Sequence, residues 1–172
     1  MRLMMQRGFT FIELAIVLVI TGILAVLALS SYRTFVDQQK LRSVAETMAG
    51  DFNWAKSQSR ARNSNLYVSF KNTSGAWCYG FTVNGTCDCA TANSCELKSV
   101  SQSDFPGSTV AITSSTLNAS TLDAVRGLLN TGAASALITS PLNTTLQVNL
   151  STLGVVSVCT PGSARMGYKA CA

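Results

Sequence analysis

The sequence predicts an α+β fold in which a long N-terminal helix packs on a mostly antiparallel β-sheet domain held by disulfides. Apolar residues run almost without a break from Phe9 to Leu29, and apolar positions then recur at helical spacing to about Arg62. From residue 63 the composition shifts to Ser, Thr, Asn and Gly, with short runs that alternate apolar and polar residues. All six cysteines lie in this second part of the chain.

The first element is an apolar segment at residues 9–30, which we predict to be a transmembrane helix. A helix of about 20 apolar residues spans the hydrocarbon core of a bilayer. Arg2 and Arg7 precede the segment, so the positive-inside rule places the short N-terminus in the cytoplasm and the chain after Ser30 on the other side. A cleaved secretory signal is the alternative, but no small-x-small cleavage site with a polar start follows the apolar run.

Glu13 is a carboxylate inside this apolar segment. An unpaired carboxylate there costs several kcal/mol, and the segment itself contains no basic residue to neutralise it. If the chain were cut after Gly8, the new α-amino group of Phe9 in one subunit could meet Glu13 of a neighbour. Assembly of several helices would then satisfy the charge.

The residues Arg7-Gly8-Phe9-Thr10-Phe11-Ile12-Glu13 resemble the signal G-F-T-L-I-E of type IV pilins and type II secretion pseudopilins. The resemblance implies that a prepilin peptidase removes residues 1–8, that Phe9 is N-methylated, and that Glu13 forms the assembly charge pair. It also implies a single-pass inner-membrane protein with a periplasmic domain at 31–172, which enters the tip of a pilus or pseudopilus. Ser30 departs from the family, since many pilins have a helix-breaking proline at this position. Without that proline, Gly22 is the one residue expected to weaken the helix.

The second element is an amphipathic helix at residues 31–62. Its apolar positions recur at intervals of three, four and about six residues, at Phe35, Leu41, Val44, Ala45, Met48, Phe52 and Ala55. Asn63-Ser64-Asn65 is a stop signal, because these side chains compete for backbone hydrogen bonds.

The remaining elements are strands within a β-rich region at 63–172. Alternation predicts them at 66–70, 77–83, 108–113, 135–139, 146–150 and 155–158, with turns at Asn84-Gly85, Pro106-Gly107 and Pro161-Gly162.

Three further segments resemble the minor pilins and pseudopilins of the FimT/FimU/GspH group: the helix end at 54–63, the strand Trp77-Cys78-Tyr79-Gly80-Phe81, and Val125-Arg126-Gly127. The resemblance implies the type IV pilin fold, with other minor and major pilins as partners. It implies a structural subunit of the tip complex that primes pilus assembly. The alternatives are a DNA-binding minor pilin for natural transformation and a minor pseudopilin of a type II secretion system.

The six cysteines predict disulfides, because the environment beyond the inner membrane is oxidising. The resemblance to the C-terminal disulfide-bounded loop of many pilins implies a pair between Cys159 and Cys171. We expect Cys78, Cys87, Cys89 and Cys95 to pair among themselves. Cys87 and Cys89 are too close in an extended chain to pair with each other, so we expect each of them to pair with Cys78 or Cys95. A Cys₄ zinc site is the less favoured alternative, since the chain has no histidine and zinc ribbons prefer paired C-x₂₋₄-C knuckles.

Charge is a weak guide to a partner. The chain has 13 Lys and Arg against 8 Asp and Glu, and loss of Arg2 and Arg7 with the leader makes it only mildly basic. Arg165 and Lys169, on either side of Tyr168, are the candidate DNA contacts. A second cluster, Lys56, Arg60 and Arg62, is better explained by the dipole at a helix C-terminus.

The G-R-x-R pattern with which some members of the group bind DNA aligns with Gly154-Val155-Val156-Ser157, where both arginines are missing. We find no catalytic motif, so we predict a protein that is not an enzyme and needs no cofactor or metal.

Overall fold

The computed structural model describes residues 9–73, 76–106, 108, 110–114, 116–118 and 120–171. The proposed leader at 1–8, with Gly8, lies outside the described residues. The chain divides into two compact units, one up to Val36 and one from Asp37 onward.

Helix α1 (Phe11–Arg62) has 52 residues and continues without a break through Gly22 and Ser30. It begins after Thr10, whose Oγ1 accepts a hydrogen bond from the Glu13 backbone N–H at 3.3 Å. It ends at Arg62, where Asn63 adopts a positive φ of 48° and closes the helix.

In the first unit the described apolar side chains of α1 are exposed except for the half-buried Ala15 and Val36, and Phe11 is 88% exposed. The helix is long and apolar enough to cross a membrane. Phe35, an apolar position of the amphipathic helix predicted at 31–62, is 57% exposed, because it lies in this unit, before the part of α1 that carries the core residues.

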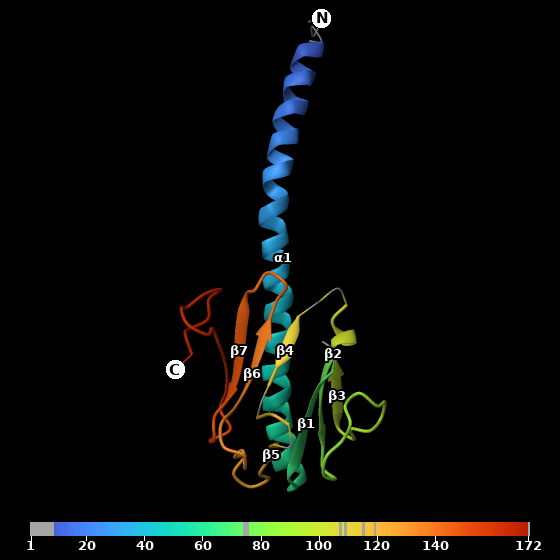
Figure 1. Cartoon of the computed structure of the whole chain (residues 1–172), viewed down its shortest axis with the longest axis vertical. Coiled ribbons are helices and arrows are strands. Elements are labelled where there is room, and N and C mark those ends of the chain that lie inside the picture. Colours follow the sequence, from blue (N-terminus) through green and yellow to red (C-terminus); the bar gives the residue numbers. More distant parts are fainter. Residues whose placement is uncertain are drawn as a thin grey trace, which may run out of the picture. The chain divides into compact units, whose positions relative to one another are not determined.

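The second unit contains two four-stranded antiparallel sheets, where the sequence suggested one (Figure 1). The first sheet has the order β3-β2-β1-β5, with β1 (Leu66–Thr73), β2 (Ala76–Thr82), β3 (Lys98–Ser101) and β5 (Ser120–Leu122). The second has the order β4-β6-β7-β8, with β4 (Ala111–Thr113), β6 (Ala134–Thr139), β7 (Thr145–Leu150) and β8 (Val156–Cys159). A short 3₁₀ helix, η1 (Gln102–Asp104), follows β3.

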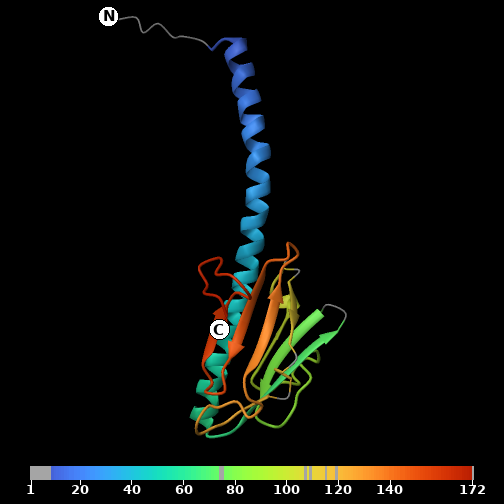
Figure 2. The same cartoon turned by 60° about the vertical axis from the view of Figure 1, so that its left-hand side comes forward.

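Figure 2 shows the two sheets side by side, with the second half of α1 along them. The core lies between this part of the helix and the inner faces of the sheets. Leu41, Met48 and Phe52 are at most 1% exposed, and the Phe52 ring meets Phe81 of β2 edge-on at 5.3 Å between centroids. Burial of these large side chains holds the helix on the sheets.

Candidate functional site

Phe9 and Glu13, the residues expected to direct assembly, are accessible in the first unit. The Phe9 side chain is 86% exposed, and the Glu13 side chain is exposed one turn into α1. The ion pairs among the described residues are Arg42–Glu46, Lys71–Asp88 and Lys98–Asp51, so the Glu13 carboxylate has no cationic partner within that part of the chain. An unpaired carboxylate on an apolar helix is costly inside a membrane.

The six cysteines are joined in three disulfides: Cys159–Cys171, Cys78–Cys89 and Cys87–Cys95. The first is the pair that the family resemblance implied. The other two disulfides join Cys89 to Cys78 and Cys87 to Cys95, as expected. The four sulfurs that a zinc site would have required are therefore all bonded in disulfides.

The C-terminal loop, which we define as residues 159–171, contacts α1 through Met166 and Tyr168. Arg42 donates a hydrogen bond from its guanidinium to the Met166 carbonyl, and its Cζ lies 5.4 Å from the centroid of the Tyr168 ring. The Tyr168 hydroxyl donates to the Glu46 carboxylate. Partial burial and this carboxylate raise the pKa of Tyr168 to about 12, so the hydroxyl stays protonated and keeps its bond at physiological pH.

Arg165 and Lys169 are both exposed on the C-terminal loop, and neither joins an ion pair within the described chain. The backbone N–H of Tyr168 donates to the Arg165 carbonyl at 2.9 Å, which closes a tight turn between them. Tyr168 is only half-exposed, and Arg42 lies over its ring. The loop therefore presents two cations, but it does not present a free aromatic face.

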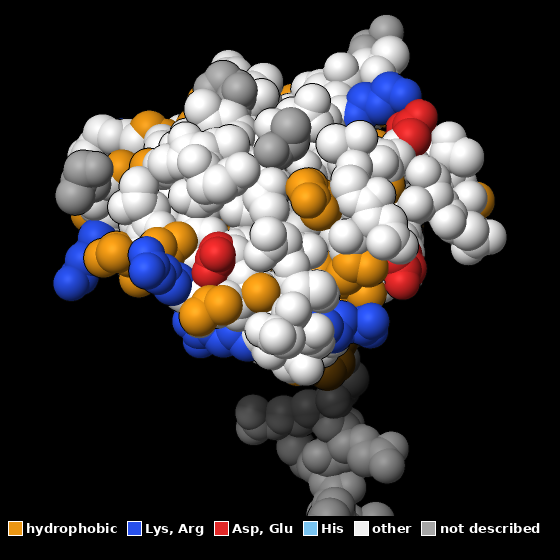
Figure 3. Space-filling view, turned by 90° about the horizontal axis from the view of Figure 1, so that it is seen from below, with side chains coloured by type: hydrophobic (Ala, Val, Ile, Leu, Met, Phe, Trp, Pro, Cys, Tyr) orange, Lys and Arg blue, Asp and Glu red, His pale blue; other side chains and the backbone are white. Residues whose placement is uncertain are grey.

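The cations near the end of α1 hold neighbouring loops. Lys56 Nζ donates to the Gly154 carbonyl at 2.8 Å, and Arg60 Nη2 donates to the Arg126 carbonyl at 3.3 Å. Gly154 itself has a φ of +68°, a conformation that suits glycine. Lys and Arg side chains lie at separate positions near the border of the face in Figure 3, with apolar and neutral side chains between them. These contacts support a structural role for the Lys56 and Arg60 cluster.

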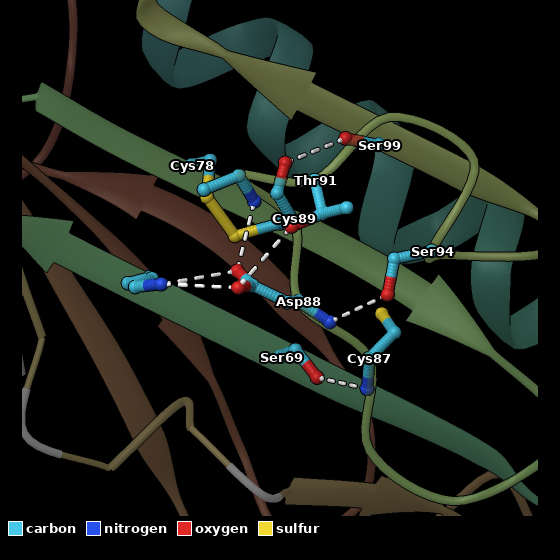
Figure 4. Close-up of polar contacts among 10 residues, drawn as sticks. Ser69, Cys78, Cys87, Asp88, Cys89, Thr91, Ser94 and Ser99 are labelled. Atoms are coloured by element: carbon cyan, nitrogen blue, oxygen red, sulfur yellow. Dashed lines mark hydrogen bonds and ion pairs between the residues drawn. A yellow bond between two sulfur atoms is a disulfide. The ribbon is translucent and has the colours of Figure 1, made fainter.

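Asp88 organises the segment between the first four cysteines, a role that the sequence reasoning missed. Its carboxylate accepts hydrogen bonds from the Ala90 backbone N–H at 3.1 Å and from Lys71 Nζ at 3.1 and 3.2 Å. Its own backbone N–H donates to Ser94 Oγ at 3.0 Å (Figure 4). The backbone N–H of Ala90 and then Lys71 lower the pKa of Asp88, because both favour the charged carboxylate. The run Cys-Asp-Cys-Ala-Thr is a signal for such a side-chain-capped turn.

A buried polar network, also missed, joins α1 to the first sheet. Asp51 on α1 is 6% exposed, and its carboxylate accepts from the Tyr79 hydroxyl at 2.9 Å and pairs with Lys98 of β3. Burial, with the Asp51 charge beside it, raises the pKa of Tyr79 far above its ordinary value of 10.0. The hydroxyl is thus a permanent donor to Asp51.

The chain matches known protein families in two regions. The family model described as type II transport protein GspH matches residues 44–154, and the model described as the prokaryotic N-terminal methylation motif matches residues 3–29. Fimbrial protein Q of Moraxella bovis is 50% identical over 46 residues, which are 26% of this chain and 29% of that protein. This chain therefore matches less than a third of the length of that curated relative.

Two crystal structures of the type IV minor pilin FimU of Pseudomonas aeruginosa have a similar fold, with TM-scores of 0.54 and 0.50. The matches cover 78% and 74% of this chain and 99% of each FimU chain, at 16% identity. They show the predicted architecture: a long N-terminal helix packed on antiparallel sheets, with disulfides.

Proposed function

The chain belongs to the GspH family of type II transport proteins, and from that premise we propose that it is a minor type IV pilin of the tip complex that primes pilus assembly. In this proposal a prepilin peptidase removes residues 1–8 and Phe9 becomes the N-methylated first residue. The helix at 9–30 holds the subunit in the inner membrane, with 31–172 in the periplasm, until the subunit joins other minor and major pilins at the tip.

The unpaired Glu13 carries the proposal. Its side chain lies on a helix whose apolar surface is uncovered in the single chain, and no cation of the described chain pairs with it. Packing identical or related helices together covers the apolar surface and brings the α-amino group of one Phe9 to the Glu13 of a neighbour. The same contact therefore stabilises the assembly and selects its register.

Replacing Glu13 tests this mechanism. We expect Glu13→Ala to insert normally into the membrane but to be strongly depleted from sheared pili, because the subunit loses its charge partner. Glu13→Asp keeps the charge and is the matched control, which should retain part of the incorporation. Membrane fractions and pili are compared by immunoblot, and wild-type incorporation of Glu13→Ala would refute the charge-pair mechanism.

A type II secretion pseudopilus is the alternative setting for the same assembly chemistry, because the family to which the chain belongs includes type II transport proteins. Deleting the gene separates the two settings. Loss of pili with normal protein secretion supports the pilus, whereas loss of secretion with normal pili supports the pseudopilus.

DNA binding is the second candidate function, because Arg165 and Lys169 are exposed without ion pairs on a disulfide-closed loop. A gel shift of the purified chain with duplex DNA at increasing salt tests it. We expect Arg165→Ala with Lys169→Ala to abolish the shift. An unchanged shift in this double variant, with a loss in Arg62→Ala, would instead place the contact at the end of α1.

A further inference from the structure

Strand β8 lies at the border of the second sheet and leaves part of its main chain unpaired. Ser151 N–H donates to the Val155 carbonyl at 2.9 Å, which identifies 151/155 as a hydrogen-bonded pair of the β7–β8 ladder. Because this pattern repeats every second residue, Ser157 and Cys159 also bond to β7. The N–H and C=O groups of Val156 and Val158 therefore point away from the sheet.

The C-terminal loop covers only the end of this edge. Thr160 N–H donates to the Lys169 carbonyl at 2.9 Å, and the Cys171 N–H donates to the Thr160 carbonyl at 3.0 Å. Met166 and Gly167 then have positive φ values of 55° and 82°, and the Arg42 bond to Met166 holds this turn at α1. The chain thus leaves the edge strand, and within the described residues no backbone group bonds to the outer side of Val156 or Val158.

A groove of about 760 Å³ opens beside this edge, and we call it the β8 groove. Its floor is the outer face of β7 and β8, and the C-terminal loop forms one wall. Gln147 and Asn149 lie on the floor, with the Gln147 amide donating to Asn149 Oδ1 at 2.6 Å, and the exposed Ser157 lies beside them. Lys169 on the wall is the one charged residue among the lining residues.

We propose that the β8 edge and the β8 groove bind an extended segment of another pilin subunit by strand addition, with a carboxylate of that segment at Lys169. This inference rests on the proposed function, which supplies neighbouring pilin subunits. A strand laid along β8 satisfies the free main-chain groups of Val156 and Val158, while its side chains on the groove side lie beside Ser157.

The chemistry of the groove favours a polypeptide over other ligands. A nucleic acid needs several cations along its backbone, and this groove has one. A sugar ring stacks on an open aromatic face, but the Tyr168 ring lies under Arg42. Neither of these ligands would use the outward main-chain groups of β8, which a strand pairs directly.

Photo-crosslinking in cells tests the proposal on the full chain. A benzophenone amino acid replaces the exposed Ser157 in the groove, and the same amino acid replaces the exposed Thr73 of β1 as the matched control. We expect the probe at Ser157 to crosslink to one extended segment of another pilin subunit, identified by mass spectrometry of the linked peptide. The probe at Thr73 should not reach that segment.

Two variants then separate strand addition from simple proximity. Val158→Pro removes an outward N–H without removing a bond of the β7 ladder, and Lys169→Glu reverses the charge on the exposed wall. Each should lower the yield of the Ser157 crosslink at least fivefold. Lys169→Glu decides the matter if Val158→Pro fails to fold, because the Lys169 side chain forms no ion pair within the described part of the chain that the fold would lose.

Incorporation into pili is measured in the same cells, so that the two proposals fail differently. Strand addition would be overturned by any of three results: no crosslink from Ser157, a crosslink to a glycan or lipid, or an unchanged crosslink yield in a folded variant. If incorporation into pili is normal in that experiment, the proposed pilin function still holds. Absence of the chain from pili would overturn the proposed function itself.

Discussion

The buried network of Asp51, Tyr79 and Lys98 leads to a quantitative prediction for Tyr79→Phe. The substitution removes one hydroxyl and keeps the ring, so packing against Phe52 and Trp77 is retained. Asp51 then loses the partner of Oδ2 while it stays 6% exposed.

The expected cost is set by the charge of the acceptor. Removing a hydrogen bond to a charged group costs about 1.5–3 kcal/mol, and Lys98 still pairs with the other carboxylate oxygen, so we expect about 2 kcal/mol. For a chain of this size that corresponds to a fall in Tm of roughly 4–8 °C. Lys98→Met should cost less, about 1 kcal/mol, because the Lys98 side chain is 38% exposed and solvent screens the pair.

Denaturant unfolding of the oxidised chain in detergent, followed by the fluorescence of Trp54 and Trp77, gives these free energies. Tyr67→Phe is the matched control, since it removes the same hydroxyl from a residue whose hydroxyl has no hydrogen-bond partner among the described residues, and it should change stability by less than about 0.5 kcal/mol. Equal free energies of unfolding for Tyr79→Phe and Tyr67→Phe would refute the assigned role of Asp51.

Two more predictions concern loops. Gly154→Ala should destabilise the chain by about 3 kcal/mol, because the added Cβ would collide with the Gly127 carbonyl and the residue has a positive φ. Gly132→Ala is the control, since Gly132 also has a positive φ but faces open space, and it should cost about 1 kcal/mol. Similar thermal midpoints for both variants would contradict this reasoning. The pKa of Asp88 lies below its ordinary 3.8, so its carboxylate stabilises the fold above about pH 4 and this contribution is lost as the pH falls through the native pKa. Asp88→Asn should therefore lose less stability than the wild type between pH 6 and pH 3 in urea unfolding, and an identical loss would count against the turn that Asp88 caps.

Strong local patterns made much of the fold predictable from the sequence. The apolar run and its helical continuation predicted a helix to about Arg62, and Asn63 does close it. Strands β6 and β7 were recognisable because each alternates over six residues. Strands β3 and β5 were not, since Lys98–Ser101 and Ser120–Leu122 each contain a single apolar residue and so show no alternation.

Contacts between distant segments were beyond sequence reasoning. The division into two sheets depends on which strands pair, and alternation within a strand does not specify its neighbour. Asp51 gave no signal of burial, because its partners Tyr79 and Lys98 come from strands 28 and 47 residues away. For the candidate site, the residues around Glu13 could be singled out by their resemblance to the pilin signal, whereas the open edge of β8 depends on the turn at Met166 and Gly167.

We propose that the carboxylate of Glu13 finds its cation only after a new amino terminus is created at Phe9. The intact mass of the protein isolated from its native membranes or pili tests this most directly. We predict a chain that lacks residues 1–8 and carries one methyl group on the Phe9 nitrogen. A mass that retains the initiator methionine would contradict the account.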